Sequence, residues 1–160
     1  NLVLLWAHNN QIEDISPLSR MAGMQQLSLN NNAISGIEAL GDMIDMEHLF
    51  LSSNKIEDIS PLRRLHALKV LRLENNNITD VSALAGLNQL EELSLASNWS
   101  LYNVQPLLLN SGLGIGDELD LRFTHVRCSD MNAFESLGAT LLRVTAINGS
   151  SCPGRRLTDP

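Results

Sequence analysis

Hydrophobic and polar positions along this chain follow a pattern that returns every 22 residues. The same apolar opening recurs at Leu2, Met24, Met46, Leu68 and Leu90. Each copy places leucine or a similar residue at its first, fourth and sixth positions, and an Asn follows three residues later. Because repeated units of this size pack mainly against their neighbours, the period predicts a linear stack of coils.

Each copy predicts a short strand, a turn and a compact return segment. In the middle copy the alternation of residues 49–51 predicts the strand, Asn54 marks the turn, and the return begins at Asp58. We expect Ser60 to be the N-cap and Pro61 the first residue of a helical turn, because Pro needs no N–H partner there. A unit of 22 residues leaves room for a single helical or 3-10 turn.

One polar position holds the same residue type in five successive copies. Its members are Asn10, Asn32, Asn54, Asn76 and Asn98. An inward-facing Asn amide offers two donors and two acceptor lone pairs, which can satisfy the backbone groups of a turn that is neither helix nor sheet. We therefore expect this asparagine ladder to have a structural role.

The repeat changes towards the end of the chain. Residues 107–116 are interpreted as four extra residues before the next strand, so that the step from Leu93 to Leu119 is 26. The three glycines of this segment are interpreted as a flexible connection, because they lack the strand-to-helix context of a phosphate-binding loop.

The last copies have the features of a cap. Thr124 stands where the ladder Asn is expected, and residues 138–144 predict one more strand. Degenerate terminal repeats are typical of solenoid ends, where one side must face water. The predicted organisation is a repeat array over residues 1–147, including the cap, and a tail or linker over residues 148–160.

The repeated unit N-x-I-x-D-I-x-P-L resembles the short class of leucine-rich repeats found in bacterial internalins and in a eukaryotic phosphatase regulatory subunit. The ending, from Gly112 through Cys128 to Thr140, is similar to the C-terminal repeats of secreted bacterial proteins of this class. The resemblance implies an α/β solenoid, a right-handed horseshoe with a parallel concave β-sheet and short helical or 3-10 turns on its convex side. It also implies binding of a macromolecule on the concave sheet and a secreted or cell-surface location. The phosphatase-like alternative implies a cytoplasmic regulatory subunit that binds an enzyme.

The chain begins inside a repeat strand, with neither a basic leader nor a polar cap before it. An uncapped first coil is expected to expose Leu2, Leu5, Ile12 and Leu18. We therefore expect a larger polypeptide in which further sequence lies upstream.

The residues between the leucines of each strand are expected to point away from the core and to form columns across the concave face. Three columns result: Trp6, Ser28, Phe50, Arg72, Ser94 and Asp120; His8, Asn30, Ser52, Glu74, Ala96 and Arg122; and Leu4, Gln26, His48, Val70, Glu92 and Glu118. The candidate ligand-binding residues are Trp6, His8, His48, Phe50, Arg72, Glu74 and Glu92, because Trp and Arg are enriched among interface hot spots. In the alternative interpretation Trp6 and Phe50 are isolated exposed aromatics, or Trp6 packs against an upstream repeat.

Charge limits the class of partner. The formal net charge is −7 and no run of Lys and Arg is longer than two residues, which argues against nucleic acid. Acidic residues gather on the later part of the concave face, where they favour a basic partner segment or are simply solvated. No apolar stretch approaches the roughly 20 residues that span a bilayer. The expected partner is a protein or peptide.

Cys128 and Cys152 are the only cysteines and lie 24 residues apart, close to one repeat. Neighbouring coils about 4.8 Å apart bring such residues within disulfide reach, which predicts a bridge in the cap and an oxidising compartment. In the alternative, Cys128 is a small buried residue and Cys152 is a free thiol in the tail.

Catalysis is not expected. The four histidines are dispersed, and no G-x-S-x-G, H-E-x-x-H or phosphate-loop motif occurs. Asp117, Glu118 and Asp120 lack the spacing of a calcium loop, so we expect neither a metal nor a cofactor. The sequence favours a non-catalytic recognition module, with a regulatory subunit and a passive spacer between domains as alternatives.

Overall fold

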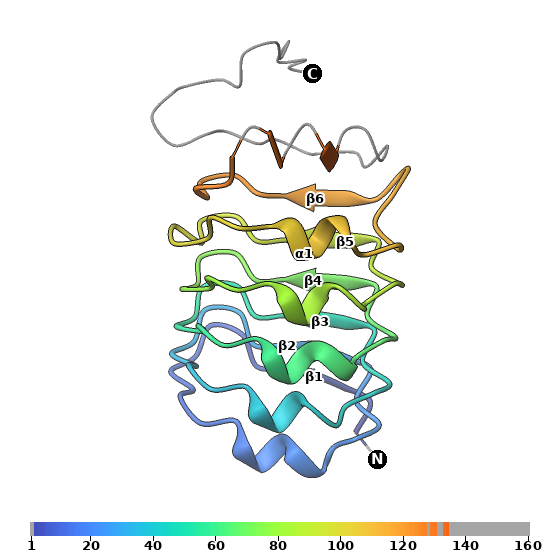
Figure 1. The fold of residues 1–160 in the computed structure, drawn as a ribbon. Coiled ribbons are helices and arrows are strands. Elements are labelled where there is room, and N and C mark those ends of the chain that lie inside the picture. The colour runs from blue at the N-terminus through green and yellow to red at the C-terminus, as the bar shows by residue number, and fades with distance from the viewer. Residues whose placement is uncertain (1, 128, 131–132, 135–160) are drawn as a thin grey trace.

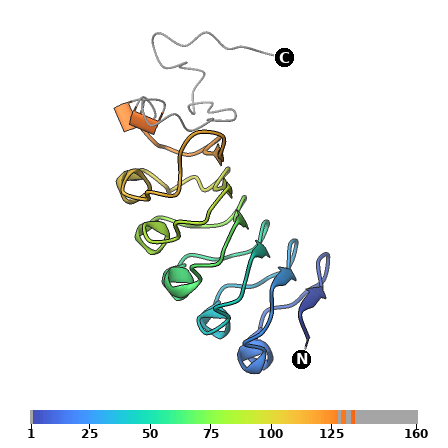
Figure 2. The same ribbon diagram turned by 90° about the vertical axis from the view of Figure 1, so that its right-hand side faces the viewer.

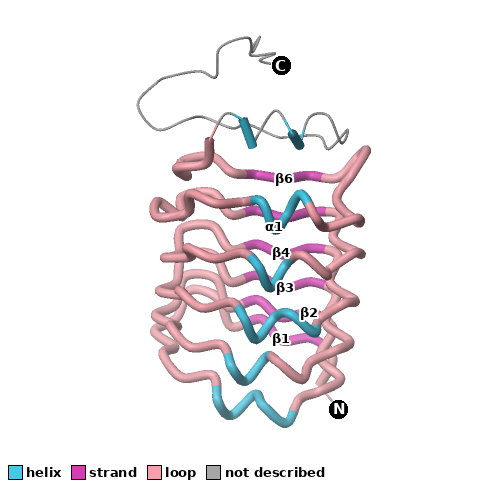
Figure 3. Tube along the Cα trace, in the orientation of Figure 1, coloured by secondary structure: helices cyan, strands magenta, loops and turns pink. Residues whose placement is uncertain are grey.

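The computed structural model describes residues 2–127, 129–130 and 133–134, and these residues form a stack of coils (Figure 1). The strands are β1 (Leu4–Trp6), β2 (Gln26–Ser28), β3 (His48–Phe50), β4 (Val70–Arg72), β5 (Glu92–Ser94) and β6 (Glu118–Asp120). The helical turns between them are the 3-10 helices η1 (Ser16–Arg20), η2 (Glu38–Leu40), η3 (Ser60–Arg64) and η4 (Ser82–Leu84), and the α-helix α1 (Gln105–Leu108). Strand and helical turn alternate along the chain (Figure 3).

The strands form one parallel sheet in sequence order, from β1 to β6. The register repeats without slippage, so that Leu5, Leu27 and Leu49 are direct partners and so are Trp6, Ser28 and Phe50. The strands line the inner side of the curved stack and the helical turns its outer side (Figure 2). The sheet, the curvature and the short helical turns confirm the predicted leucine-rich-repeat solenoid.

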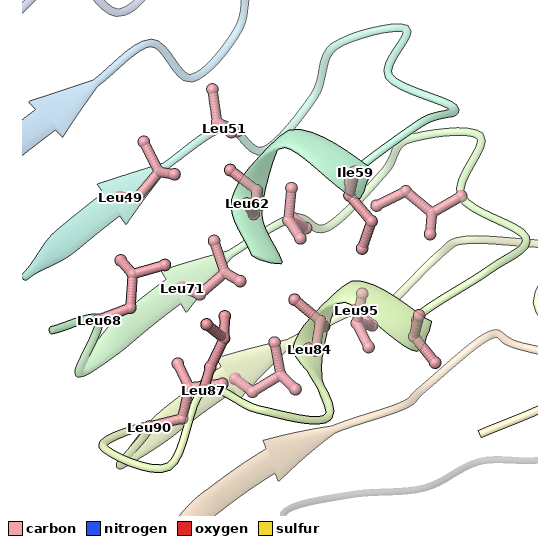
Figure 4. Packing of buried hydrophobic residues seen from close by; sticks show 14 of the residues in the cluster. Leu49, Leu51, Ile59, Leu62, Leu68, Leu71, Leu84, Leu87, Leu90 and Leu95 are labelled. Atoms are coloured by element: carbon pink, nitrogen blue, oxygen red, sulfur yellow. The ribbon is translucent and has the colours of Figure 1, made fainter. Parts of the chain in front are cut away.

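The core lies between the sheet and the helical turns (Figure 4). The middle residue of each strand from β2 onwards, such as Leu49 and Leu71, is buried, and Ile59 and Leu62 meet these strands from the convex side. Each repeat contributes the same apolar positions, so the buried side chains form one continuous column along the stack. Burial of each such leucine contributes about 1.5–3 kcal/mol.

The helical turns begin one residue earlier than the sequence predicted. Ile59, not Ser60, is the N-cap of η3, and Pro61 is therefore the second helical residue. The Asp58 carboxylate accepts hydrogen bonds from the Ser60 N–H at 2.8 Å and from the Ser60 hydroxyl at 3.0 Å, which holds the pKa of Asp58 below its usual value. Asp14 makes the same pair of bonds at η1. The Asp side chain therefore replaces the expected Ser cap.

The asparagine ladder joins each coil to the one before it. The Asn76 Oδ1 accepts a hydrogen bond from the Ile56 N–H at 3.0 Å, one coil earlier. Its Nδ2 donates to the carbonyls of Leu51, also one coil earlier, at 3.0 Å, and of Leu73 in its own coil at 3.1 Å. Asn32, Asn54 and Asn98 make the equivalent bonds. Asn10, in the first coil, is exposed and bonds only to carbonyls of its own coil.

The ladder position of the last described coil holds Thr124. Its side chain is buried, and its hydroxyl donates to the Leu121 carbonyl at 2.7 Å. Thr thus reproduces the bond that each ladder Asn makes within its own coil. No bond from the Thr124 side chain to the preceding coil is found among the described residues.

The 26-residue step contains two insertions. The N-cap residues Val81 and Val104 are 23 positions apart, so one extra residue precedes α1, and the other three lie between α1 and β6. The prediction that all four fall within residues 107–116 is therefore wrong for one of them. The early insertion lies in the loop that contains Trp99.

Glycine in this segment serves close packing as well as freedom of the backbone. A side chain at Gly112 would place its Cβ 2.2 Å from the Asn88 carbonyl oxygen, so only glycine fits. Gly116 has a φ of +96°. The Asn110 amide is buried and donates to the carbonyls of Leu84 and Leu87 at 2.8 and 3.1 Å. The interpretation as a flexible connection is therefore wrong at Gly112.

Several predictions concern residues outside the described part of the chain. These are the Cys128–Cys152 bridge, the strand at residues 138–144 and the tail at 148–160. At the other end Leu2 is 45% exposed, whereas Leu5, Ile12 and Leu18 are half-buried. Within the described residues no helix has the length and apolar character needed to cross a bilayer.

Candidate functional site

The concave face divides into two parts of different chemistry. The first, here called the aromatic half, presents Leu4, Trp6, His8, Gln26, Ser28, Asn30, His48, Phe50 and Ser52 from β1 to β3 and the residues that follow them. The second, the charged half, presents Val70, Arg72, Glu74, Glu92, Ser94, Ala96, Glu118, Asp120 and Arg122 from β4 to β6. The aromatic half has no Asp, Glu, Lys or Arg, whereas the charged half has four carboxylates and two guanidinium groups.

An open pocket of about 470 Å³ lies in the aromatic half. Its lining residues are Trp6, His8, Gln26, Ser28, Asn30, Asn31, His48 and Phe50. The lining residues lie on β1, β2 and β3 or directly after these strands. The parallel register brings them together, because residues one repeat apart are direct partners in the sheet. Trp6 is 66% exposed, so most of its indole is available to a ligand. Four of the seven candidate binding residues therefore meet in one pocket.

The pocket combines an apolar surface with hydrogen-bonding groups, and its lining contains no Asp, Glu, Lys or Arg. Trp6 and Phe50 supply the aromatic surface, and amide, hydroxyl and imidazole groups surround it. The Nδ1 atom of His48 is buried and has no hydrogen-bond partner among the described residues. Such a group costs about 1–3 kcal/mol unless water or a ligand pairs with it. Pockets with an aromatic lining and a few convergent polar groups are typical of ligand sites.

The other three candidate residues bind one another. The Arg72 guanidinium forms an ion pair with Glu92 and lies 4.0 Å from the Glu74 carboxylate. Glu74 also accepts a hydrogen bond from the Ser52 hydroxyl. Arg72 is therefore engaged within the protein, although its column position alone indicated an interface residue. This network adjoins the pocket through Ser52.

A second ion pair lies at the far end of the charged half. The Arg122 Nε donates to the Asp120 carboxylate at 2.9 and 3.0 Å, and the Arg122 backbone N–H donates to the same carboxylate at 3.0 Å. The hydrogen bonds to Asp120 raise the pKa of Arg122. Much of the negative charge that the sequence placed on this face is therefore neutralised locally. Within the described residues no group of His, Cys, Asp and Glu side chains is arranged to hold a metal ion.

Sequence reasoning missed a group of exposed aromatic side chains away from the concave face. Trp99, Tyr102 and Phe123 are 52%, 58% and 46% exposed, and they lie in the loops that follow β5 and β6. The signal was present as a one-residue insertion near Trp99 and as Phe123 in a column otherwise occupied by Asn and Ser.

Comparison with known families agrees with this geometry. A family model described as "Leucine Rich repeats (2 copies)" matches residues 1–41, 23–64 and 66–105. The chain belongs to the leucine-rich-repeat family. Proteins of this family generally mediate recognition between proteins, which agrees with an open concave sheet that carries the candidate residues.

Solved structures show the same architecture in leucine-rich-repeat proteins of bacteria. An internalin (InlF) from Listeria monocytogenes is similar with a TM-score of 0.82 and 30% identity, over 94% of this chain and 45% of the internalin. A leucine-rich-repeat protein from Leptospira interrogans is similar with a TM-score of 0.77 and 22% identity, over 89% of this chain and 37% of that protein. Internalin C2 from Listeria monocytogenes has a TM-score of 0.61 and 24% identity, over 91% of this chain and 71% of its own.

The share of each structure that is covered and the sequence identity determine what these similarities show. The chain spans less than half the length of the first two structures. The chain is internalin-like in its repeats, while the likeness to the second and third structures, under 25% identical, concerns the fold alone. No curated protein sequence matches the chain significantly.

Proposed function

We propose that this chain is a non-catalytic recognition module that binds a segment of a partner protein in the pocket of its aromatic half. The observation that carries the proposal is the convergence of Trp6, Phe50, His8 and His48 on one open pocket. Large aromatic side chains surrounded by uncharged polar groups are typical of interface hot spots. The amide side chains of Gln26, Asn30 and Asn31 in the pocket lining give such a segment polar groups to bind.

The rigidity of the solenoid supports the same role. The sheet register and the ladder bonds hold the pocket-lining strands in place, so little order has to be gained on binding. In the neighbouring charged half, the ion pairs of Arg72 hold its guanidinium group within the protein. The partner segment therefore anchors in the aromatic half, and the charged half sets which flanking charges are tolerated.

The similarity to internalins supports a secreted or cell-surface location, with a cytoplasmic regulatory subunit as the alternative. Titration of thiols in freshly purified, denatured protein distinguishes these locations. A bridge between Cys128 and Cys152 leaves no titratable thiol, as expected for an oxidising compartment. Two free thiols would contradict the exported form of the proposal.

The binding proposal is tested by selection from a library of random peptides, displayed on phage, against the immobilised chain. Affinities of selected peptides are then measured from the emission of Trp6 in a Trp99→Phe variant, which leaves Trp6 as the single tryptophan. Replacement of Phe50 by Ala is expected to weaken binding about 30-fold or more, as for a hot-spot residue. Leu109→Ala is the matched control, because Leu109 is 78% exposed and outside the pocket.

Two outcomes contradict this proposal. One is a selection that enriches no peptide, which favours the passive spacer. The other is a set of peptides whose affinity is unchanged by Phe50→Ala, which places recognition elsewhere on the molecule. Equal thermal unfolding midpoints of the variant and the parent show that any loss concerns binding and not folding.

A further inference from the structure

An exposed aromatic cluster lies at the edge of the solenoid, in the loops that follow β5 and β6. We define this edge cluster as Trp99, Tyr102, Phe123 and His125. The Trp99 and Phe123 rings lie 6.1 Å apart at 32°, and the Tyr102 and His125 rings stack at 4.7 Å and 14°. Three of the six Phe, Trp and Tyr residues of the chain are therefore found in these two loops, and all three are exposed.

The position of Trp99 depends on an insertion that the preceding coil lacks. The loop between β5 and α1 has one residue more than the loop between β4 and η4, and Trp99 lies in this longer loop. The His125 Nδ1–H donates a hydrogen bond to the Trp99 carbonyl, which ties the loop to the next coil. The insertion is therefore held in a defined conformation and presents the indole at the edge.

Phe123 is exposed at the expense of backbone strain. It has a φ of 57°, in the left-handed region that large side chains rarely adopt. The equivalent position in the other coils holds Asn9, Asn31, Ser53, Asn75 and Ser97. The left-handed conformation is therefore a property of the repeated turn, and what distinguishes this coil is a large exposed side chain at a position that suits Asn or Ser better. This exchange supports a binding role for the edge cluster.

The chemistry of the two loops narrows the ligand class. Residues 97–103 and 123–125 include no Asp, Glu, Lys or Arg, so these loops have no carboxylate, ammonium or guanidinium group to pair with a charged ligand. The Asn98 amide is buried in the ladder, and the Asn103 Oδ1 accepts from the Gln105 N–H at 3.0 Å. Among the described residues the Trp99 indole N–H and the Tyr102 hydroxyl have no partner. The loops thus offer aromatic ring faces and hydrogen-bond donors to an uncharged ligand.

We propose that the edge cluster binds a proline-rich segment of a partner protein in the polyproline II conformation. The C–H groups of proline rings pack against the electron-rich faces of Trp and Tyr. A polyproline II helix has no internal hydrogen bonds, so its carbonyls are free to accept from the indole N–H and the Tyr102 hydroxyl. Aromatic-lined surfaces bind such segments at low ordering cost.

A carbohydrate fits the edge cluster less well. Sugar hydroxyls both donate and accept, so their recognition calls for free amides or carboxylates beside the aromatic rings. In the loop of residues 97–103 both ends of the Asn98 amide and the Asn103 Oδ1 already have partners, so neither amide has its donor and its acceptor free together. The available groups therefore match free carbonyls better than pairs of hydroxyls.

The test uses a blocked oligoproline peptide of about ten residues, which forms polyproline II in water. In a Trp6→Phe variant Trp99 is the single tryptophan, and its emission is expected to change saturably on titration. Phe123→Asn and Tyr102→Ala are each expected to weaken binding about tenfold, because each removes one aromatic contact. Phe123→Asn is also expected to raise the unfolding midpoint, because Asn tolerates the left-handed conformation.

Phe123→Asn is thus expected to weaken binding while it raises the unfolding midpoint. These opposite changes distinguish a binding role of Phe123 from a structural role. Leu109→Ala, an exposed residue outside both the pocket and the edge cluster, is the matched control and is expected to leave oligoproline binding unchanged. Titration without a saturable response, or with a response that survives both substitutions, overturns the proposal. Tighter binding of a linear oligosaccharide such as cellohexaose also overturns it, as does a dimer that Phe123→Asn abolishes in sedimentation velocity. None of these outcomes bears on the concave pocket.

Discussion

The two halves of the concave face share one scaffold and differ in what their side chains have available for a partner. The aromatic half leaves Trp6 largely exposed beside an open pocket and has no Asp, Glu, Lys or Arg. The charged half has more polar residues, yet Arg72 is engaged by Glu92 and Arg122 by Asp120. Charge content and charge available for binding are therefore different quantities. The half with fewer charges is the one that has the exposed Trp6 and the open pocket.

The strongest expected effect tests whether the scaffold is the same beneath both halves. Asn54 lies under the aromatic half and Asn76 under the charged half, and both make the same bonds to their own and the preceding coil. Replacement of either by Ala is expected to lower the free energy of unfolding by about 1–3 kcal/mol, because buried backbone groups lose their partners. Denaturant unfolding measures both values.

The matched control for this prediction is Asn10→Ala. Asn10 is exposed and bonds only within its own coil, so its loss is expected to be less than about 0.5 kcal/mol. A large difference between Asn54→Ala and Asn76→Ala would show that the halves differ in scaffold as well as in surface.

A smaller effect is expected from the ion pairs that distinguish the charged half. Arg72→Ala leaves Glu74 and Glu92 without their shared cation and is expected to destabilise the protein by about 1 kcal/mol or less, because the arginine side chain is 43% exposed and screened by solvent. The loss is expected to vanish near 1 M salt, where charges are screened within about 3 Å. Unfolding in low and high NaCl measures it.

Trp6→Ala is the control for the salt experiment. It removes no charge, so any change in stability is expected to be the same at both salt concentrations. If the effect of Arg72→Ala were equally insensitive to salt, packing rather than charge would define the charged half.

The smallest expected effect concerns the contact between the two halves. Glu47 lies just before β3 and Lys69 just before β4. The Glu47 carboxylate accepts a hydrogen bond from the Lys69 ammonium at 2.8 Å. This hydrogen bond holds the pKa of Glu47 below its ordinary value of 4.5 and raises the pKa of Lys69 above 10.5. A depressed carboxylate pKa stabilises the folded state above the unfolded pKa, and this contribution is lost as pH falls through the folded value.

Lys69→Met is therefore expected to reduce the loss of stability on acidification below pH 4.5. For the raised pKa of Lys69 the sign is reversed, because its contribution is present below 10.5 and is lost as pH rises through the folded value. Thermal unfolding measured from acidic to alkaline pH tests both expectations. Lys55→Met, which removes an exposed lysine without an ion pair in the described structure, is expected to leave the acidic and the alkaline changes in stability as they are in the parent protein.

The period of the sequence was sufficient to predict the fold, because every repeat has its apolar residues and its Asn at the same positions. A shift by one residue would move Leu49 and Leu71 from the core to the surface together, so the register of the sheet was equally predictable. The start of the helical turns was not, because Ser60 and Asp58 both qualify as caps and their geometry decides between them.

The candidate site was predictable as a set of columns but not as a set of contacts. The pattern placed Trp6 and Phe50 on one face, and the structure places them in one pocket. Whether Arg72 turns towards Glu92 or towards solvent depends on rotamers and neighbouring charges, which no period specifies. The edge cluster depends on one inserted residue and on Phe123 in a strained position, and both interrupt the pattern instead of following it.

The direction of the asparagine bonds has a consequence for how such arrays evolve. The Oδ1 atoms of Asn54 and Asn76 each accept a hydrogen bond from the coil before them. Every internal coil therefore makes the same kind of bond to the preceding coil and receives the same kind of bond from the following one. Duplication of one whole repeat within the array leaves every donor with an acceptor, whereas deletion of part of a repeat does not. A gene of this kind can therefore change the length of its product in whole coils, at little risk to folding.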